Sequence, residues 1–256
     1  MELQLGFSPC PNDTFIFDAM LHGKIDTEGI TFIPVIEDVE SLNQKALQQE
    51  LAITKLSYHA FAHLVDKYIL LDAGSALGFG VGPLLISKNK IEHIEDKIAN
   101  LKIGIPGKLT TANFLLNIAF PQAQQKVEMV FSEIENALIN EEIDLGLIIH
   151  ENRFTYAAKG LHKVIDLGSF WEQKTGSAIP LGGIVMSRKY DKQTLDKVNR
   201  IMASSVEFAM KNPLSSAAFV KQHAQEMEEL ALAQLRYLAM YSLLFFLLLP
   251  NLRNIY

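Results

Sequence analysis

Four short polar segments carry side chains that could hold or transform a small molecule. Each follows an apolar run and precedes a segment of helical character: SPCPND (8–13), TKLS (54–57), GKLTT (107–111) and HENR (150–153). In open α/β sheets, ligands bind at the carboxyl ends of the strands, close to helix N-termini whose N–H groups favour anions. The four segments therefore predict a site for a polar or anionic small molecule.

His150 is the candidate for proton transfer. It follows the apolar run 145–149. Partial desolvation at a strand end keeps an imidazole neutral near pH 7, and a neutral imidazole can act as a general base. Lone histidines are often structural, so the residue by itself leaves both roles open.

Two further segments offer groups that bind carboxylates and hydroxyls. Lys55 can pair with a carboxylate, and Ser57 can cap a helix or bind a ligand directly. Thr110 and Thr111 place two hydroxyls at a helix start, where Gly107 permits a close backbone approach. Plain helix capping explains both segments as well as a ligand does.

The first segment is stiffened by its prolines. Pro9 and Pro11 fix their own φ angles and push the preceding residues into extended conformations. We expect Asn12 and Asp13 to cap the following helix. Cys10 has no nearby base in the sequence to activate its thiol, so we expect it to be dispensable. The segment can be a capped turn or part of a ligand site.

No metal or nucleotide motif is convincing. His59 and His63 share a helix face, but no acidic or cysteine partner completes a zinc set. The segment 107–111 lacks the spacing of a Walker loop, and GFGVG (78–82) lacks the GxGxxG pattern. We interpret GFGVG as a hinge or a loop close to the ligand, and we expect no metal site.

The elements that must position these residues form two series of alternating strands and helices. This pattern predicts an α/β fold with largely parallel sheets. In the first series the predicted strands are 3–7, 29–37 and 51–57, and the predicted helices are 15–23, 39–49 and 57–67. In the second, the predicted strands are 102–106, 127–131 and 144–150, and the predicted helices are 110–120 and 133–142.

The two series indicate two lobes. Because no low-complexity linker separates them, we expect the chain to cross between the lobes more than once. The predicted first lobe comprises residues 1–87 and 183–256, and the second comprises 88–182. A cleft between two such lobes is a common place for a small ligand.

Composition excludes several classes of protein. The chain has 256 residues, 49% of them hydrophobic, which is enough for a large core. Its net charge of -6 argues against a nucleic-acid partner. The single cysteine, Cys10, cannot form an internal disulfide. The N-terminus lacks the basic and apolar pattern of a secretory signal, so we expect a cytoplasmic protein.

The C-terminal segment is unusually apolar. The run Leu238–Leu249 is shorter than the ~20 residues of a membrane-spanning helix. We therefore expect no stable membrane insertion.

Four strings together resemble one enzyme family. LGFSPCPNDTFIF, ITKLSYHAF, IPGKLTTANFLL and DLGLIIHENRFTY, in this order and spacing, are similar to the 1,4-dihydroxy-6-naphthoate synthases of the futalosine route to menaquinone. The resemblance covers about residues 1–223. It implies a two-lobed fold like that of type II periplasmic binding proteins, with a ligand cleft between the lobes.

The resemblance also implies an activity. Such an enzyme is a carbon–carbon lyase that converts cyclic dehypoxanthine futalosine to 1,4-dihydroxy-6-naphthoate and dihydroxyacetone without a cofactor. His150 is then the proton acceptor. The implied substrate-binding residues are Lys55, Leu56, Ser57, Thr110, Thr111, Ser8 and Asn12.

Other readings stay open at this point. The same fold serves chorismate dehydratase-like enzymes and non-catalytic binding proteins for small carboxylates. A homodimer is also open. After Glu229 the sequence departs from the family, which a truncation or a change of reading frame would explain.

Overall fold

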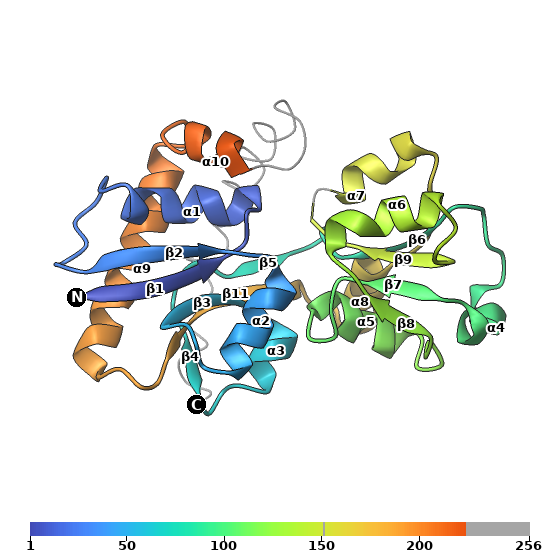
Figure 1. Ribbon diagram of the computed structural model, residues 1–256, viewed down its shortest axis with the longest axis horizontal. Coiled ribbons are helices and arrows are strands. Elements are labelled where there is room, and N and C mark those ends of the chain that lie inside the picture. The colour runs from blue at the N-terminus through green and yellow to red at the C-terminus, as the bar shows by residue number, and fades with distance from the viewer. Residues whose placement is uncertain (151, 224–256) are drawn as a thin grey trace. The chain divides into compact units, whose positions relative to one another are not determined.

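The computed structural model describes residues 1–150 and 152–223, which form two compact units (Figure 1). The first unit contains residues 1–57, 61–77 and 182–223, and the second contains 58–60 and the described residues of 78–181. Glu229 and the apolar run that follows it lie outside the described residues. Among the described helices, none has the length and hydropathy needed to span a bilayer.

The first unit is built on a six-stranded sheet. Its strand order is β2 (Thr31–Ile36), β1 (Glu2–Phe7), β3 (Ile53–Ser57), β11 (Ile179–Ser187) and β4 (Tyr68–Leu70), and β5 (Ala76–Gly78) also pairs with β11. β1 runs parallel to β2 and β3, whereas β11 runs antiparallel to β3 and β4. The sheet is therefore mixed and not largely parallel.

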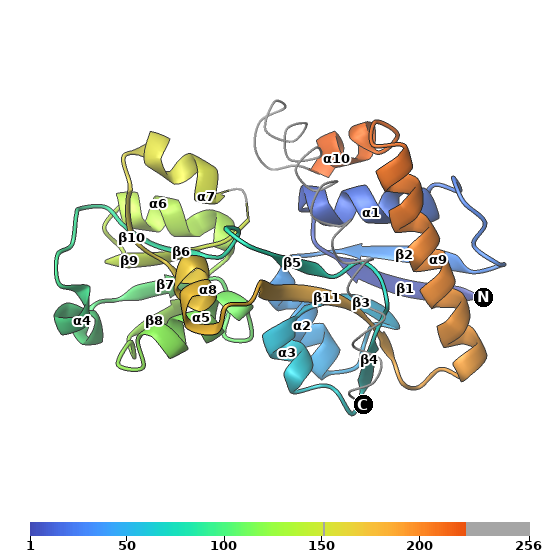
Figure 2. The same ribbon diagram turned by 180° about the vertical axis from the view of Figure 1, so that it is seen from behind.

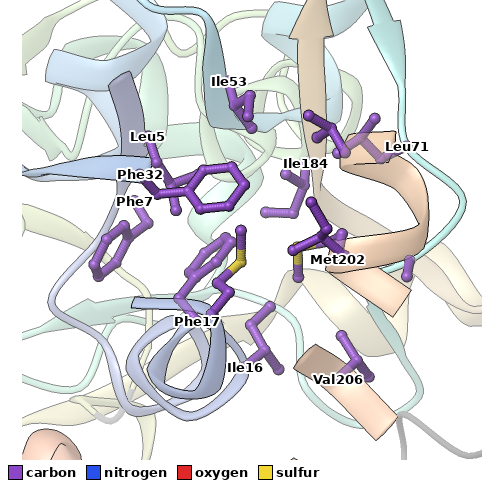
Figure 3. Close-up of a cluster of buried hydrophobic side chains, with 14 of the residues drawn as sticks. Leu5, Phe7, Ile16, Phe17, Phe32, Ile53, Leu71, Ile184, Met202 and Val206 are labelled. Atoms are coloured by element: carbon purple, nitrogen blue, oxygen red, sulfur yellow. The ribbon is translucent and has the colours of Figure 1, made fainter. Parts of the chain in front are cut away.

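Helices bury both faces of this sheet. They are α1 (Pro11–Leu21), α2 (Val39–Leu47), α3 (Tyr58–Ala62), of which 61–62 belong to this unit, α9 (Lys192–Lys211) and α10 (Ala217–His223). Figure 3 shows Phe17, Ile184 and Met202 pointing toward one another in the larger apolar cluster, which joins α1 and α9 to the strands. Because this core holds α1 against the sheet, it also positions the polar segment 8–13 at the start of α1.

The second unit has its own five-stranded sheet. Its strand order is β10 (His162–Asp166), β6 (Leu84–Ser87), β9 (Leu145–Ile148), β7 (Ile103–Ile105) and β8 (Lys126–Glu128). It too is mixed, because β6 is antiparallel to both its neighbours while β7 is parallel to β8 and β9. Residues 78–87 were expected in the first lobe, but they belong to this unit because β6 pairs with β9 and β10.

Helical segments cover both faces of the second sheet. They are α4 (Ile94–Lys97), η1 (Ile98–Asn100), α5 (Thr111–Ala119), η2 (Phe131–Glu133), α6 (Ile134–Ile139), α7 (Asn152–Thr155), η3 (Tyr156–Lys159) and α8 (Leu167–Thr175). Helix α6 lies on one face of this sheet and α5 and α8 lie on the other (Figure 2). Along β6, Leu85 packs with α5 and α8, whereas Ile86 packs with α6. This alternation is what a strand buried on both faces requires.

The start of α1 differs from the prediction. The helix begins at Pro11, four residues earlier than expected, and Cys10 occupies its N-cap position but its side chain does not cap the helix. Proline is favoured at a first helical position because its φ angle is already helical. Asn12 and Asp13 therefore lie inside the first turn, and the prediction that they cap the helix was wrong.

The last glycine of the GFGVG segment, Gly82, packs directly against the backbone of Gly168. A Cβ added at Gly82 would overlap the Gly168 backbone, with the Gly168 nitrogen at 2.6 Å. Gly82 leads into β6 and Gly168 lies in the first turn of α8, so the contact fixes the start of the strand against the helix. The end of the GFGVG segment is thus tightly packed against α8.

We expect Gly82→Ala to destabilise the protein by at least about 1–3 kcal/mol, because backbone cannot move aside as a flexible side chain can. Thermal or urea unfolding measures this. Gly80→Ala is the control: its Cβ meets nothing within 4 Å, and only its φ of +67° opposes the change, at about 1 kcal/mol. Equal losses in the two variants would contradict the close packing.

Candidate functional site

β3 sorts the TKLS segment onto two faces of the first sheet. Successive side chains of a strand point to opposite faces, so Lys55 and Ser57 share one face and Leu56 takes the other. Leu56 is fully buried in an apolar cluster with Tyr68 and Val185. Its side chain therefore belongs to the apolar core, on the face opposite Lys55 and Ser57, and the predicted substrate contact of Leu56 stays a prediction.

A buried carboxylate connects two predicted site residues. Asp13 is fully buried in the first turn of α1. Its Oδ1 accepts a hydrogen bond from Lys55 Nζ, and its Oδ2 accepts bonds from the Ser8 backbone N–H (3.0 Å) and the Ser8 hydroxyl (2.7 Å). Ser8 and Lys55 are thus held together by Asp13, which the sequence analysis assigned to capping. The signal for it was that a lysine inside an apolar strand needs a buried counter-ion.

The charge of Lys55 is set by two opposing effects. Burial by itself would lower the pKa of the Lys55 ammonium, because desolvation disfavours the charged form. The charge of Asp13, the interaction with Cys10 and the hydrogen bond to Asp13 together outweigh burial and hold this pKa above its ordinary value of 10.5. Lys55 is therefore charged at neutral pH.

Ser57 is fixed by a second buried partner. The Asn43 side-chain amide of α2 donates to the Ser57 hydroxyl (3.0 Å), and the Ser57 backbone N–H donates to the Asn43 side-chain oxygen Oδ1 (3.1 Å). Both side chains are buried. This reciprocal pair presets the Ser57 hydroxyl at the end of β3. Sequence reasoning missed Asn43, which lies in an ordinary amphipathic helix.

The two threonines predicted to bind substrate, Thr110 and Thr111, are both anchored at the start of α5. Thr110 is its N-cap residue: its hydroxyl accepts from the Asn113 N–H (3.2 Å) and donates to the Gly107 carbonyl (2.8 Å). The Thr111 hydroxyl donates to the Leu181 carbonyl (2.8 Å). The interpretation of Thr110 as a helix cap is therefore confirmed. The side chains of Thr110 and Thr111 are both buried.

His59 lies against the same helix start. Its Nδ1 is 3.3 Å from the Thr110 carbonyl oxygen, and its ring centroid is 5.1 Å from that of Phe114. A carbonyl can only accept, so this contact places the proton on Nδ1. In the first turn of α5, the Asn113 side-chain oxygen is buried without a hydrogen-bond partner among the described residues.

His150 lies between β9 and α7 in an uncommon backbone conformation. Its φ of 57° is left-handed, which few non-glycine residues adopt outside special sites. The imidazole is half-buried and meets the Phe131 ring edge-on at 5.2 Å. Three residues later, Arg153 donates to the Gly82 carbonyl and to Asp166 (3.0 Å). The segment that carries His150 is therefore tied to the body of the second unit.

Of the remaining predicted residues, Asn12 is half-buried in the first turn of α1. Residues 1–150 and 152–223 contain no cluster of three or more His, Cys, Asp or Glu side chains arranged for a metal ion. Cys10 is buried and forms no disulfide.

With this geometry established, comparison with known proteins identifies the family. Residues 3–245 match the protein family described as menaquinone biosynthesis. The chain belongs to this family. The match continues past Glu229, beyond the span of about 1–223 expected from the sequence.

Two relatives in this family are named 1,4-dihydroxy-6-naphthoate synthase. The one from Thermus thermophilus is 42% identical over 227 residues, which cover 89% of this chain and 81% of the relative. The one from Streptomyces coelicolor is 36% identical over 232 residues, covering 88% and 80%.

Solved structures agree on the fold. Protein AF1704 of Archaeoglobus fulgidus has a TM-score of 0.84 at 36% identity, covering 93% of this chain and 87% of that one. The periplasmic aliphatic sulphonate binding protein SsuA of Escherichia coli has a TM-score of 0.61 at 11% identity, covering 93% and 83%. The family fold is thus that of periplasmic binding proteins, as the sequence predicted.

We expect Lys55→Met to destabilise the protein by about 3–5 kcal/mol, because it leaves the buried Asp13 carboxylate without its counter-ion. Urea unfolding measures the loss. Lys45→Met is the matched control: Lys45 pairs with Glu37 at the surface (3.2 Å), where such pairs contribute no more than about 1 kcal/mol. A loss as small as that of the control would contradict the importance of the pair.

The same pair predicts a pH dependence. Since the pKa of Lys55 is raised in the folded protein, its contribution is fully present below the ordinary value of 10.5 and is lost as pH rises through the folded value. The stability difference between the native protein and Lys55→Met should stay constant from about pH 7 to about pH 9 and shrink above pH 10.5. A difference that shrinks already near pH 8 would show that Lys55 is not stabilised as a cation.

Proposed function

We propose that the protein is a cytoplasmic 1,4-dihydroxy-6-naphthoate synthase, a carbon–carbon lyase. Its proposed reaction splits cyclic dehypoxanthine futalosine into 1,4-dihydroxy-6-naphthoate and dihydroxyacetone. The observation that carries the proposal is the 42% identity to a synthase of that name across 89% of this chain. The half-buried His150, placed at a strand end, supports a reaction that begins with proton removal.

We assign the proton acceptor to His150. A neutral imidazole at a strand end can take a proton near pH 7, and the Phe131 ring restricts the orientations open to it. The left-handed backbone at His150 is a strained conformation of the kind found at functional sites.

We assign substrate binding to polar groups that the fold presets. Ser57 and Thr110 are fixed by Asn43 and by the start of α5, so little rotamer freedom is lost when a ligand binds. Asn12 and the N–H groups at the start of α5 suit a carboxylate or hydroxyls. Thr111 belongs to the same helix start. Ser8 and Lys55 act with Asp13, supplying a fixed positive charge next to a buried acid.

The direct test is to incubate the protein with cyclic dehypoxanthine futalosine and to detect dihydroxynaphthoate by mass spectrometry. We expect product without an added metal or cofactor. If the folded protein binds the compound but releases no product, it is a binding protein of this fold. If it instead dehydrates chorismate, it is the related enzyme.

We expect His150→Gln to lower kcat by about 10²–10⁴-fold, because general-base catalysis contributes about that much, while substrate affinity stays near native. Steady-state kinetics and calorimetric titration measure the two quantities. His93→Gln is the matched control, since His93 is also left-handed (φ 53°) but exposed at the start of α4. An unchanged rate in His150→Gln would remove His150 from this role.

A further inference from the structure

Glu135 is a buried carboxylate in α6 that none of the roles above uses. Its exposed fraction is 2%. Its Oε2 accepts from the Asn152 amide (2.6 Å) and the Lys159 ammonium (2.8 Å), whereas Oε1 has no hydrogen-bond partner among the described residues. Burying a carboxylate is costly unless it is well paired, so a half-satisfied one calls for an explanation.

Glu135 shares a helical face with the residue that contacts His150. Phe131 in η2 and Glu135 in α6 are four residues apart on consecutive helical segments, so their side chains lie on the same side. Phe131 meets the His150 imidazole, and Glu135 binds Asn152 and Lys159. One helical face therefore holds both ends of the segment 150–159.

The segment depends on such contacts for its conformation. α7 has four residues, too few for a helix to be stable without tertiary contacts. The left-handed φ of His150 is a strained conformation for a non-glycine residue and opposes it as well. Asn152 is the second residue after His150 and is itself buried. The hydrogen bond from Asn152 to Glu135 thus fixes the start of α7, two residues after the strained residue.

We propose that Glu135 is the positioning residue for His150. Through Asn152 it holds the turn that His150 begins, and so it sets the orientation of the imidazole. This inference rests on the proposed role of His150 as proton acceptor. Loss of the Glu135 carboxylate misplaces the base while leaving the groups that bind the substrate unchanged.

The kinetic signature is a fall in kcat without a matching change in KM. For Glu135→Ala we expect kcat to fall about 10- to 100-fold, the scale of a displacement near 1 Å at a reacting group, with KM within about threefold. Glu135→Gln keeps an oxygen that accepts from Asn152 and should restore most of kcat. Glu133→Ala, an exposed neighbour, should change neither. A native kcat in Glu135→Ala, or an equal loss in Glu133→Ala, overturns the proposal.

Asn152→Ala removes the same hydrogen bond from its other side. It provides the test if Glu135→Ala does not fold. It leaves the pair between Glu135 and Lys159 in place and should lower kcat to the same extent. The double variant should lose no more than either single variant, because the two residues act through one contact. Additive losses would contradict the inference.

A readout without turnover separates this proposal from the proposed reaction. The ring resonance of His150 can be assigned by NMR as the histidine signal that His150→Gln removes. We expect Glu135→Ala to shift or broaden this signal and Glu133→Ala to leave it unchanged. If the native protein makes no product, the proposed function fails while the spectra still test Glu135. An unaltered His150 signal in Glu135→Ala overturns the positioning role.

Discussion

The first unit is organised around the buried pair of Asp13 and Lys55. Asp13 stands in the first turn of α1, accepts from Ser8 directly after β1, and binds Lys55 on β3. One carboxylate thus connects the start of α1 with the end of β1 and the middle of β3. Because each ion would be costly to bury alone, the pair keeps α1, β1 and β3 in a fixed position relative to one another. The charge of Lys55 and the place of Ser8 follow from that constraint.

In the second unit, buried polar contacts hold the segment that carries His150. His150 adopts a left-handed conformation ahead of a very short helix, so local structure cannot hold it. Glu135 anchors the segment through Asn152, and Arg153 anchors it through Asp166 and Gly82. In both units, polar groups inside an apolar core orient a residue proposed to act on the substrate. This is consistent with a rigid scaffold that carries preorganised groups.

The fold class and the positions of the polar segments were readable from local pattern. Apolar strands followed by helix starts placed Ser57 at the end of β3, and Thr110 and His150 in the segments that follow β7 and β9, as the structure has them. Strand direction was not readable, since β6 and β11 have the same composition whether they run parallel or antiparallel to their neighbours. The side-chain face was missed for Leu56, although the two-residue period of a strand separates it from Lys55 and Ser57.

The sequence by itself determined the polar segments, their order and the family, because residue types and spacing are properties of the chain. The tertiary structure alone decided which buried groups pair. Asp13 looked like a helix cap, and Asn43 and Glu135 looked like ordinary helix residues. Their partners lie 42, 14 and 17 residues away along the chain. Pairings at such separations depend on how helices dock on sheets, which no local pattern encodes.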